Sequence, residues 1–209
     1  GIRLVKEVTN NIENYDLGIA LDNIYSFIRD EFCDWYIEMC KSRIYSDDIQ
    51  EKTRVSYVLD YVFRNSMKLL HPFMPFVTTE IYRCLVNYDN EELMMSKWPE
   101  INKDISYDKE ENQVEIMKEV IVEIRNIRTK MNVHPSKKSK LIFVTTELKQ
   151  AIEASKEFIC KLGFGNEIIV QENETNISSN AVSIIKNNVK LFIPFEELVD
   201  IDKEIERLE

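Results

Sequence analysis

The chain has 209 residues, of which 44% are hydrophobic and 31% are charged, so it can bury a sizeable core in one large or two small domains. No apolar run reaches the ~18–20 residues of a membrane helix, and the charged N-terminus excludes a signal peptide, so we expect no membrane partner. The formal net charge of −10 argues at first against a nucleic-acid partner, DNA included.

Long helices are predicted for the first two thirds of the chain, because only four glycines and five prolines interrupt it. A helix is expected over residues 2–14, and Asp16 can cap the next one. From Leu17 the apolar residues recur at steps of three and four, which predicts one amphipathic helix of about seven turns that ends at Ser46. Four of its aromatics are expected mainly in the core: Phe27, Phe32, Trp35 and Tyr36.

A third helix is predicted over 49–70, with five inward residues: Val55, Val58, Val62, Ser66 and Leu69. His71-Pro72 ends it because proline lacks a donor and restricts the residue before it. Pro75 suits a first helical turn, so Phe76–Val86 is the fourth helix. A polar loop follows to about Asp108, in which Trp98 is expected to cover the bundle. The fifth helix runs over 109–131, with Met117, Ile121 and Ile124 among its inward residues.

The pattern changes after Pro135. Strands are predicted at 141–145 and 167–170, with a helix over 147–162 between them. A hairpin follows, with strands at 183–185 and 189–193 joined at Asn187-Asn188. The expected fold class is therefore mainly α: a helical bundle over 1–135, a small α/β (β-α-β-hairpin) module over 136–197, and a helical stretch over 198–209.

No catalytic or metal-binding motif occurs in the sequence. It has no glycine-rich phosphate loop, no H-E-x-x-H and no G-x-S-x-G. The four cysteines lack zinc-site spacing and are expected to be buried or half-buried thiols. Both histidines precede prolines and are interpreted as turn residues. We therefore predict no catalytic residue, no metal and no cofactor within this chain.

Charge is distributed unevenly. Residues 121–140 contain six basic residues against Glu123 alone, a local charge of +5 in an acidic chain. Such a strip can contact phosphates, or it can be a solvated helix face. The carboxylate pairs Asp30/Asp34 and Asp34/Glu38 have helical spacing and are either a solvated face or acceptors for base edges.

Five segments resemble the C-terminal part of the valyl-tRNA synthetases, in the order that the family has them: FIRDEFCDWYIEMCK (27–41), LLHPFMPFVTTEIY (69–82), SKWPE (96–100), IRNIRTKMNVHPSKK (124–138) and FIPFEELVDIDKEIERLE (192–209). The resemblance covers nearly the whole chain. HPFMPF is shared with the isoleucyl and leucyl enzymes, whereas FCDWYIE together with the RNIR segment is more specific to the valyl branch.

The resemblance implies an anticodon-binding helical bundle, a small α/β module and the start of a C-terminal coiled coil at 198–209. It also implies a cytoplasmic valine–tRNA ligase as the parent protein, which uses ATP and Mg²⁺ in an upstream catalytic domain of the same polypeptide. The HIGH and KMSKS signatures of that domain do not occur here. The implied partners are valine tRNA and the upstream domain.

The contact residues that we predict depend on this resemblance together with helical spacing. Asp30, Asp34, Ile37 and Lys41 fall on one α-helical face at steps of four, three and four, and we expect that face to contact the anticodon loop. Backbone phosphates are expected to contact Arg125, Arg128, Lys137 and Lys138. Two alternatives stay open: the equivalent domain of an isoleucyl- or leucyl-type synthetase, and a helical protein-interaction module.

Overall fold

The structure is a computed structural model that describes residues 2–85, 92–100, 107–186 and 188–199. The chain forms two compact units, an N-terminal unit over Gly1–Ile105 and a C-terminal unit over Ser106–Glu209. The predicted mainly α fold with a small α/β module is confirmed. Helix α6 belongs to the C-terminal unit, so the compact units divide about 30 residues before the boundary predicted at residue 135.

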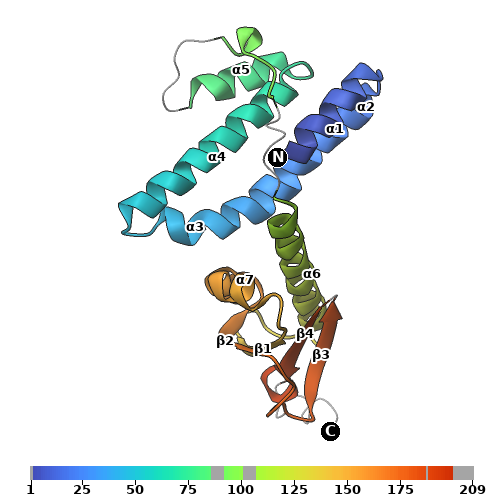
Figure 1. The fold of residues 1–209 in the computed structure, drawn as a ribbon, viewed down its shortest axis with the longest axis vertical. Coiled ribbons are helices and arrows are strands. Elements are labelled where there is room, and N and C mark those ends of the chain that lie inside the picture. Colours follow the sequence, from blue (N-terminus) through green and yellow to red (C-terminus); the bar gives the residue numbers. More distant parts are fainter. Residues whose placement is uncertain (1, 86–91, 101–106, 187, 200–209) are drawn as a thin grey trace. The chain divides into compact units, whose positions relative to one another are not determined.

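The N-terminal unit is helical (Figure 1). Its elements are α1 (Ile2–Glu13), α2 (Leu17–Ser26), η1 (Phe27–Ile37), α3 (Glu38–Ile44), α4 (Ile49–Leu70), α5 (Pro75–Arg83) and the short 3-10 helix η2 (Leu93–Met95). Helices α2, η1 and α3 are continuous, which confirms the predicted long helix. Asp16 makes no side-chain cap, contrary to prediction; instead Tyr15 takes a positive φ of 64° and turns the chain.

The middle of that long helix is π-helical. Segment η1 spans 11 residues, more than the single-turn bulge in which π geometry usually occurs. Hydrogen bonds from residue i to i+5 bring every fifth residue together. Phe27, Phe32 and Ile37 have that spacing, and all three are buried or half-buried. The Phe32 ring stacks against Phe63 of α4, with 5.9 Å between the centroids.

Two apolar clusters hold the N-terminal unit together. The first joins α1, α2 and α4 through Leu4, Val8, Ala20, Ile24 and Leu69. Trp98 packs against this cluster and donates from Nε1 to Thr9 Oγ1 at 3.0 Å, which confirms that it covers the bundle. The second joins Met67 and Tyr82 to Leu93 of η2.

The turn before α4 ends in a capping residue. Asp48 accepts hydrogen bonds from the amides of Gln50 (2.9 Å) and Glu51 (3.3 Å), two of the donors that a helix N-terminus leaves unpaired. Replacing Asp48 with alanine should therefore lower the free energy of unfolding by about 1 kcal/mol. Urea denaturation checks this, with Asp47→Ala as the control, which should differ from the wild type by less than about 0.5 kcal/mol.

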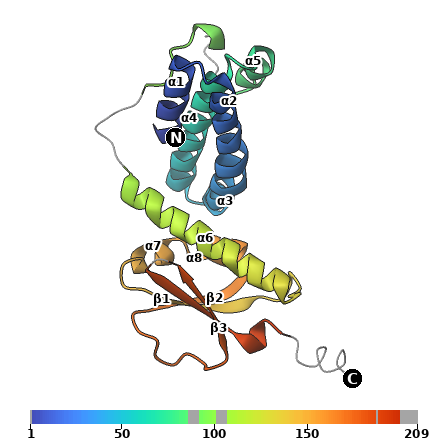
Figure 2. The same ribbon diagram turned by 90° about the vertical axis from the view of Figure 1, so that its right-hand side faces the viewer.

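The C-terminal unit places three helices on one side of a four-stranded sheet (Figure 2). Its elements are α6 (Asp108–Lys130), β1 (Ser139–Val144), α7 (Lys149–Ala154), α8 (Lys156–Leu162), β2 (Gly165–Gln171), β3 (Ala181–Lys186), β4 (Val189–Pro194) and the 3-10 helix η3 (Phe195–Glu197). The strand order is β2-β1-β4-β3; β1 pairs parallel with β2 and antiparallel with β4. The predicted β-α-β-hairpin is confirmed, although the helix over 147–162 is broken at Ser155.

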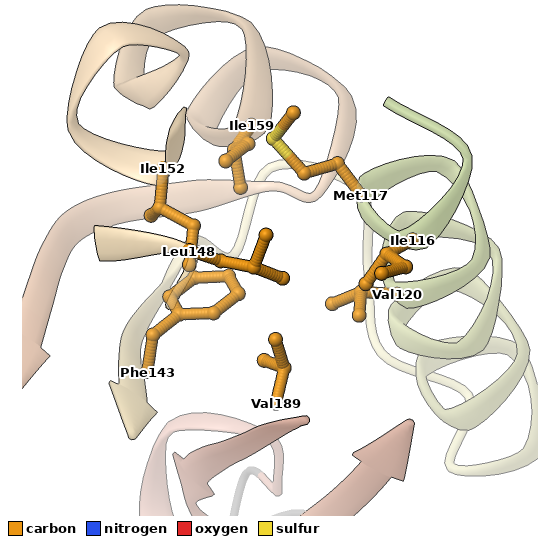
Figure 3. Close-up of a pocket in the computed structure, with 8 residues that line it drawn as sticks. All are labelled: Ile116, Met117, Val120, Phe143, Leu148, Ile152, Ile159 and Val189. Atoms are coloured by element: carbon orange, nitrogen blue, oxygen red, sulfur yellow. The ribbon is translucent and has the colours of Figure 1, made fainter. Parts of the chain in front are cut away.

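The core of this unit lies between the helices and the sheet (Figure 3). Its side chains converge from all layers and leave a void of only about 10 Å³: Ile116, Met117, Val120, Phe143, Leu148, Ile152, Ile159 and Val189. Gly163 follows α8 because a Cβ there would lie 2.8 Å from the Ile159 carbonyl oxygen. The next residue, Phe164, takes a positive φ of 56°, a costly conformation for an aromatic residue.

Two sequence predictions need correction, and one lies outside the described residues. Cys33 and Cys84 are exposed, whereas Cys40 is buried and Cys160 half-buried as predicted. Val58 was expected among the inward residues of α4 but is exposed. The coiled coil predicted over 198–209 lies outside the described residues beyond Val199.

Candidate nucleic-acid interface

The predicted contact face of the long helix changes with the π geometry. Asp30, Asp34 and Ile37 lie in η1, whereas Lys41 lies in α3. A π-helix has more residues per turn than an α-helix, so residues three or four positions apart no longer lie one above the other on the same side. Ile37 falls instead on the row of Phe27 and Phe32 and is half-buried. The α-helical spacing that predicted one common face for these four residues therefore does not apply in the π-helical segment.

The charged members of this group have local partners. Arg29 Nε donates to Asp30 Oδ1 at 2.9 Å, and Lys41 Nζ pairs with the Glu38 carboxylate. Asp34 is exposed. Surface pairs of this kind contribute only about 0–1 kcal/mol, so a ligand can replace them. The helix therefore presents an acidic group at Asp30 and Asp34, and an ammonium group one turn beyond Ile37.

The pKa values of Tyr36 and Arg29, which lie near this surface, are raised. Partial burial, and then the neighbouring Cys40 thiol, raise the pKa of Tyr36 to about 12. A hydrogen bond with Tyr25 and the charge of Asp30 raise the pKa of Arg29. Tyr36 is therefore a neutral hydroxyl and Arg29 a full cation at physiological pH.

Arg128, which was predicted to contact phosphate, lies inside the C-terminal unit. It is only 3% exposed, and burial lowers its pKa. Its guanidinium donates to Ser139 Oγ (3.2 Å) and to the carbonyl oxygens of His134 (3.1 Å) and Lys137. It also lies 4.8 Å from the centre of the Phe164 ring, within cation–π range. The predicted phosphate contact of Arg128 is therefore wrong, because its N–H groups donate to carbonyl oxygens of the protein's own backbone.

We call Arg128, His134, Lys137, Ser139 and Phe164 the Arg128 cluster. It also holds the C-terminal segment, because Lys137 Nζ donates to the Val199 carbonyl oxygen at 2.9 Å and Ser139 Oγ donates to that of Glu197 at 3.3 Å. The Glu197 carboxylate accepts from the Lys140 amide. These contacts fasten η3 to the start of β1.

The other basic residues of the motif differ in exposure. Arg125 is half-buried, and its Nε donates to the Leu162 carbonyl oxygen at 2.9 Å, at the C-terminus of α8 where carbonyl groups lack helical donors. Lys137 is half-buried within the Arg128 cluster, whereas Lys138 is exposed. Lys138 is thus the predicted phosphate contact that remains fully at the surface.

The two histidines have turn roles, as predicted. His71 Nδ1 lies 2.8 Å from the buried Thr78 hydroxyl, whose oxygen also lies 2.8 Å from the Met74 carbonyl oxygen. His134 Nδ1 accepts from the Ser136 amide at 3.2 Å. Within the described part of the chain, no group of three or more His, Cys, Asp or Glu side chains could hold a metal ion. In the same residues, no helix is both long and apolar enough to cross a membrane.

Comparison with known proteins identifies the family. Residues 2–145 match the family described as "Anticodon-binding domain of tRNA ligase", which is well over half of the chain. The chain belongs to this family of anticodon-binding domains.

Curated relatives of this anticodon-binding domain are called valine–tRNA ligase. The protein of Clostridium perfringens is 40% identical over 206 residues, and that of Clostridium acetobutylicum is also 40% identical over 206. The Geobacillus stearothermophilus protein is 32% identical over 209 residues. Each alignment covers 98% of this chain but only 23% of the relative, so the chain spans about a quarter of their length. The names do not favour the isoleucyl or leucyl alternative.

Proposed function

We propose that this chain recognises the anticodon stem-loop of valine tRNA as part of a valine–tRNA ligase. The observation that supports this most is the family match over residues 2–145, together with 40% identity to valine–tRNA ligases along nearly the whole chain. The full-length protein would be a cytoplasmic enzyme that ligates valine to its tRNA.

ATP and Mg²⁺ would be bound by that enzyme outside this chain. The described residues offer no metal-binding group, and the sequence contains no phosphate-binding loop. The contribution of this chain would be to position the tRNA, and the upstream catalytic domain of the same polypeptide would be its permanent partner.

The proposed contacts divide into positioning and reading. Lys138, together with Lys137 and Arg125, would contact backbone phosphates, which fix the register of the RNA. Asp34 and Asp30 would accept hydrogen bonds from exposed base edges, and Lys41 would donate to bases or phosphate, because unstacked loop bases expose these groups. Ile37, which is half-buried, would contact the RNA only through the exposed part of its side chain.

Filter binding of valine tRNA to the full-length ligase tests this proposal. Lys138→Ala should reduce the slope of log affinity against log salt by about 0.7–0.9, the value for one lost phosphate contact. Asp34→Ala should weaken binding by a factor corresponding to about 1–3 kcal/mol. Lys149→Ala is the matched control, since Lys149 is an exposed lysine of the same unit paired with Glu172 at 3.5 Å.

Two outcomes would contradict the proposal. Binding of the wild type that does not weaken as salt rises would argue against a phosphate-dependent RNA interface. Equal affinity for valine, isoleucine and leucine tRNAs would argue against valine-tRNA recognition and for a general role in the synthetase branch.

A further inference from the structure

Helix α4 carries a row of exposed side chains that the contacts above do not use. Ile49, Thr53, Tyr57 and Tyr61 recur at every fourth residue and therefore follow one side of the helix. Ile49 is 77% exposed, Tyr57 71% and Tyr61 56%. Single exposed apolar residues are common, but a row of three on one helix, with the exposed Val58 beside it, indicates a contact surface. We call Ile49, Thr53, Tyr57 and Tyr61 the α4 row.

The α4 row borders a shallow groove. It measures about 510 Å³ and is lined by Ile49, Gln50, Thr53, Arg54 and Tyr57, all from the first turns of one helix. Enclosed small-molecule sites usually converge from several elements and bury most of the ligand. A surface formed by one helix suits a flat group that lies against it, such as an aromatic ring stacked on a tyrosine.

The charge of α4 fits an anionic ligand. Over residues 49–70 the helix carries four basic residues against two acidic ones, in a chain whose net charge is −10. Arg54 lines the groove and forms an exposed ion pair with Glu51 at 3.2 Å. Such a pair contributes little to stability, so a phosphate can take the place of Glu51. Lys52 is exposed on the same turn.

We propose that the α4 row stacks unpaired RNA bases, with Arg54 and Lys52 contacting the adjacent phosphates. The inference rests on the proposed tRNA function and names a second contact region for it. Tyrosine rings stack on any base, and basic residues that follow the strand are what single-stranded RNA surfaces combine with them. Tyrosine is also enriched at the centre of protein interfaces, so the excess of basic over acidic residues on α4 is the feature that favours RNA as the occupant.

Binding of valine tRNA to full-length variants tests this assignment. Tyr57→Ala and Tyr61→Ala should each weaken binding roughly 5- to 150-fold, the range for loss of one stacked base. Tyr57→Phe keeps the ring and should stay within about 2-fold of the wild type, because stacking needs the ring and not the hydroxyl. Tyr15→Ala, also an exposed tyrosine, should bind like the wild type.

Acetylation of tyrosines by N-acetylimidazole, mapped by mass spectrometry, gives a second test that uses the wild-type enzyme. Tyr57 and Tyr61 should react in the free enzyme and become protected when tRNA is added, whereas Tyr15 should react in both states. Tyrosines of the row that are already unreactive without RNA would show that another part of the protein covers them, and would overturn the assignment.

The failure of this inference can be told apart from failure of the proposed function. Wild-type, salt-sensitive tRNA binding that Tyr57→Ala and Tyr61→Ala leave unchanged would overturn the α4 row alone. Absence of specific tRNA binding by the wild type would overturn both.

Discussion

Replacing Arg128 with methionine should lower the free energy of unfolding by about 3 kcal/mol, without any RNA present. The side chain is buried, and three backbone or hydroxyl acceptors depend on its donors. Methionine preserves much of the volume but leaves the His134 and Lys137 carbonyl oxygens without these donors. Each buried polar group left unpaired costs about 1–3 kcal/mol. Urea denaturation of the chain measures the change.

The exposed neighbour Lys130 provides the control. Lys130→Met, on the last turn of the same helix, should change the stability by less than about 0.5 kcal/mol. An Arg128→Met variant with wild-type stability but weaker tRNA binding would restore the phosphate role and contradict the Arg128 cluster as a stabilising element.

Phe143→Ala should have the largest effect on stability, about 3–5 kcal/mol. Phe143 lies on β1 at the centre of the core in Figure 3, where residues from α6, α7, α8 and β4 surround it. The native void there is only about 10 Å³, so loss of the ring opens a cavity that neighbouring strands and helices cannot easily fill. Differential scanning calorimetry or urea denaturation measures the loss.

A variant on the outer side of α6 completes this comparison. Val122→Ala removes an exposed side chain and should cost less than about 0.5 kcal/mol. Similar losses for Phe143→Ala and Val122→Ala would mean that the sheet and α6 do not share one packed core.

Much of the fold follows from apolar periodicity and from the proline and glycine signals. Helix α4 begins and ends at the predicted residues, because Asp48 caps it and Pro72 follows it. The π-helical segment was missed because its apolar residues recur at four as well as at five, and four is also an α-helical step. The break at Ser155 was missed because both short helices keep their apolar residues at helical spacing.

The candidate site was less predictable than the fold. Arg128 lies four residues after Ile124 and seven after Ile121, so it continues the inward row of α6. That spacing could have identified it as a buried residue, but the basic residues around it made a phosphate contact the simpler interpretation. The α4 row was missed because the inward face predicted for this helix included Val58, which is exposed beside the row. Of Val55 and Val58, only Val55 is buried.

The contacts that close each unit also set an order for folding during synthesis. The hydrogen bond from Trp98 to Thr9 joins residues 89 positions apart and completes the cover of the helical bundle once residue 98 is free. The hydrogen bond from Lys137 to Val199 joins residues 62 positions apart, so it cannot form in the C-terminal unit until residue 199 has left the ribosome. Domains generally fold as units from the N-terminal end. The helical bundle can therefore close while the sheet of the C-terminal unit still awaits its last strand.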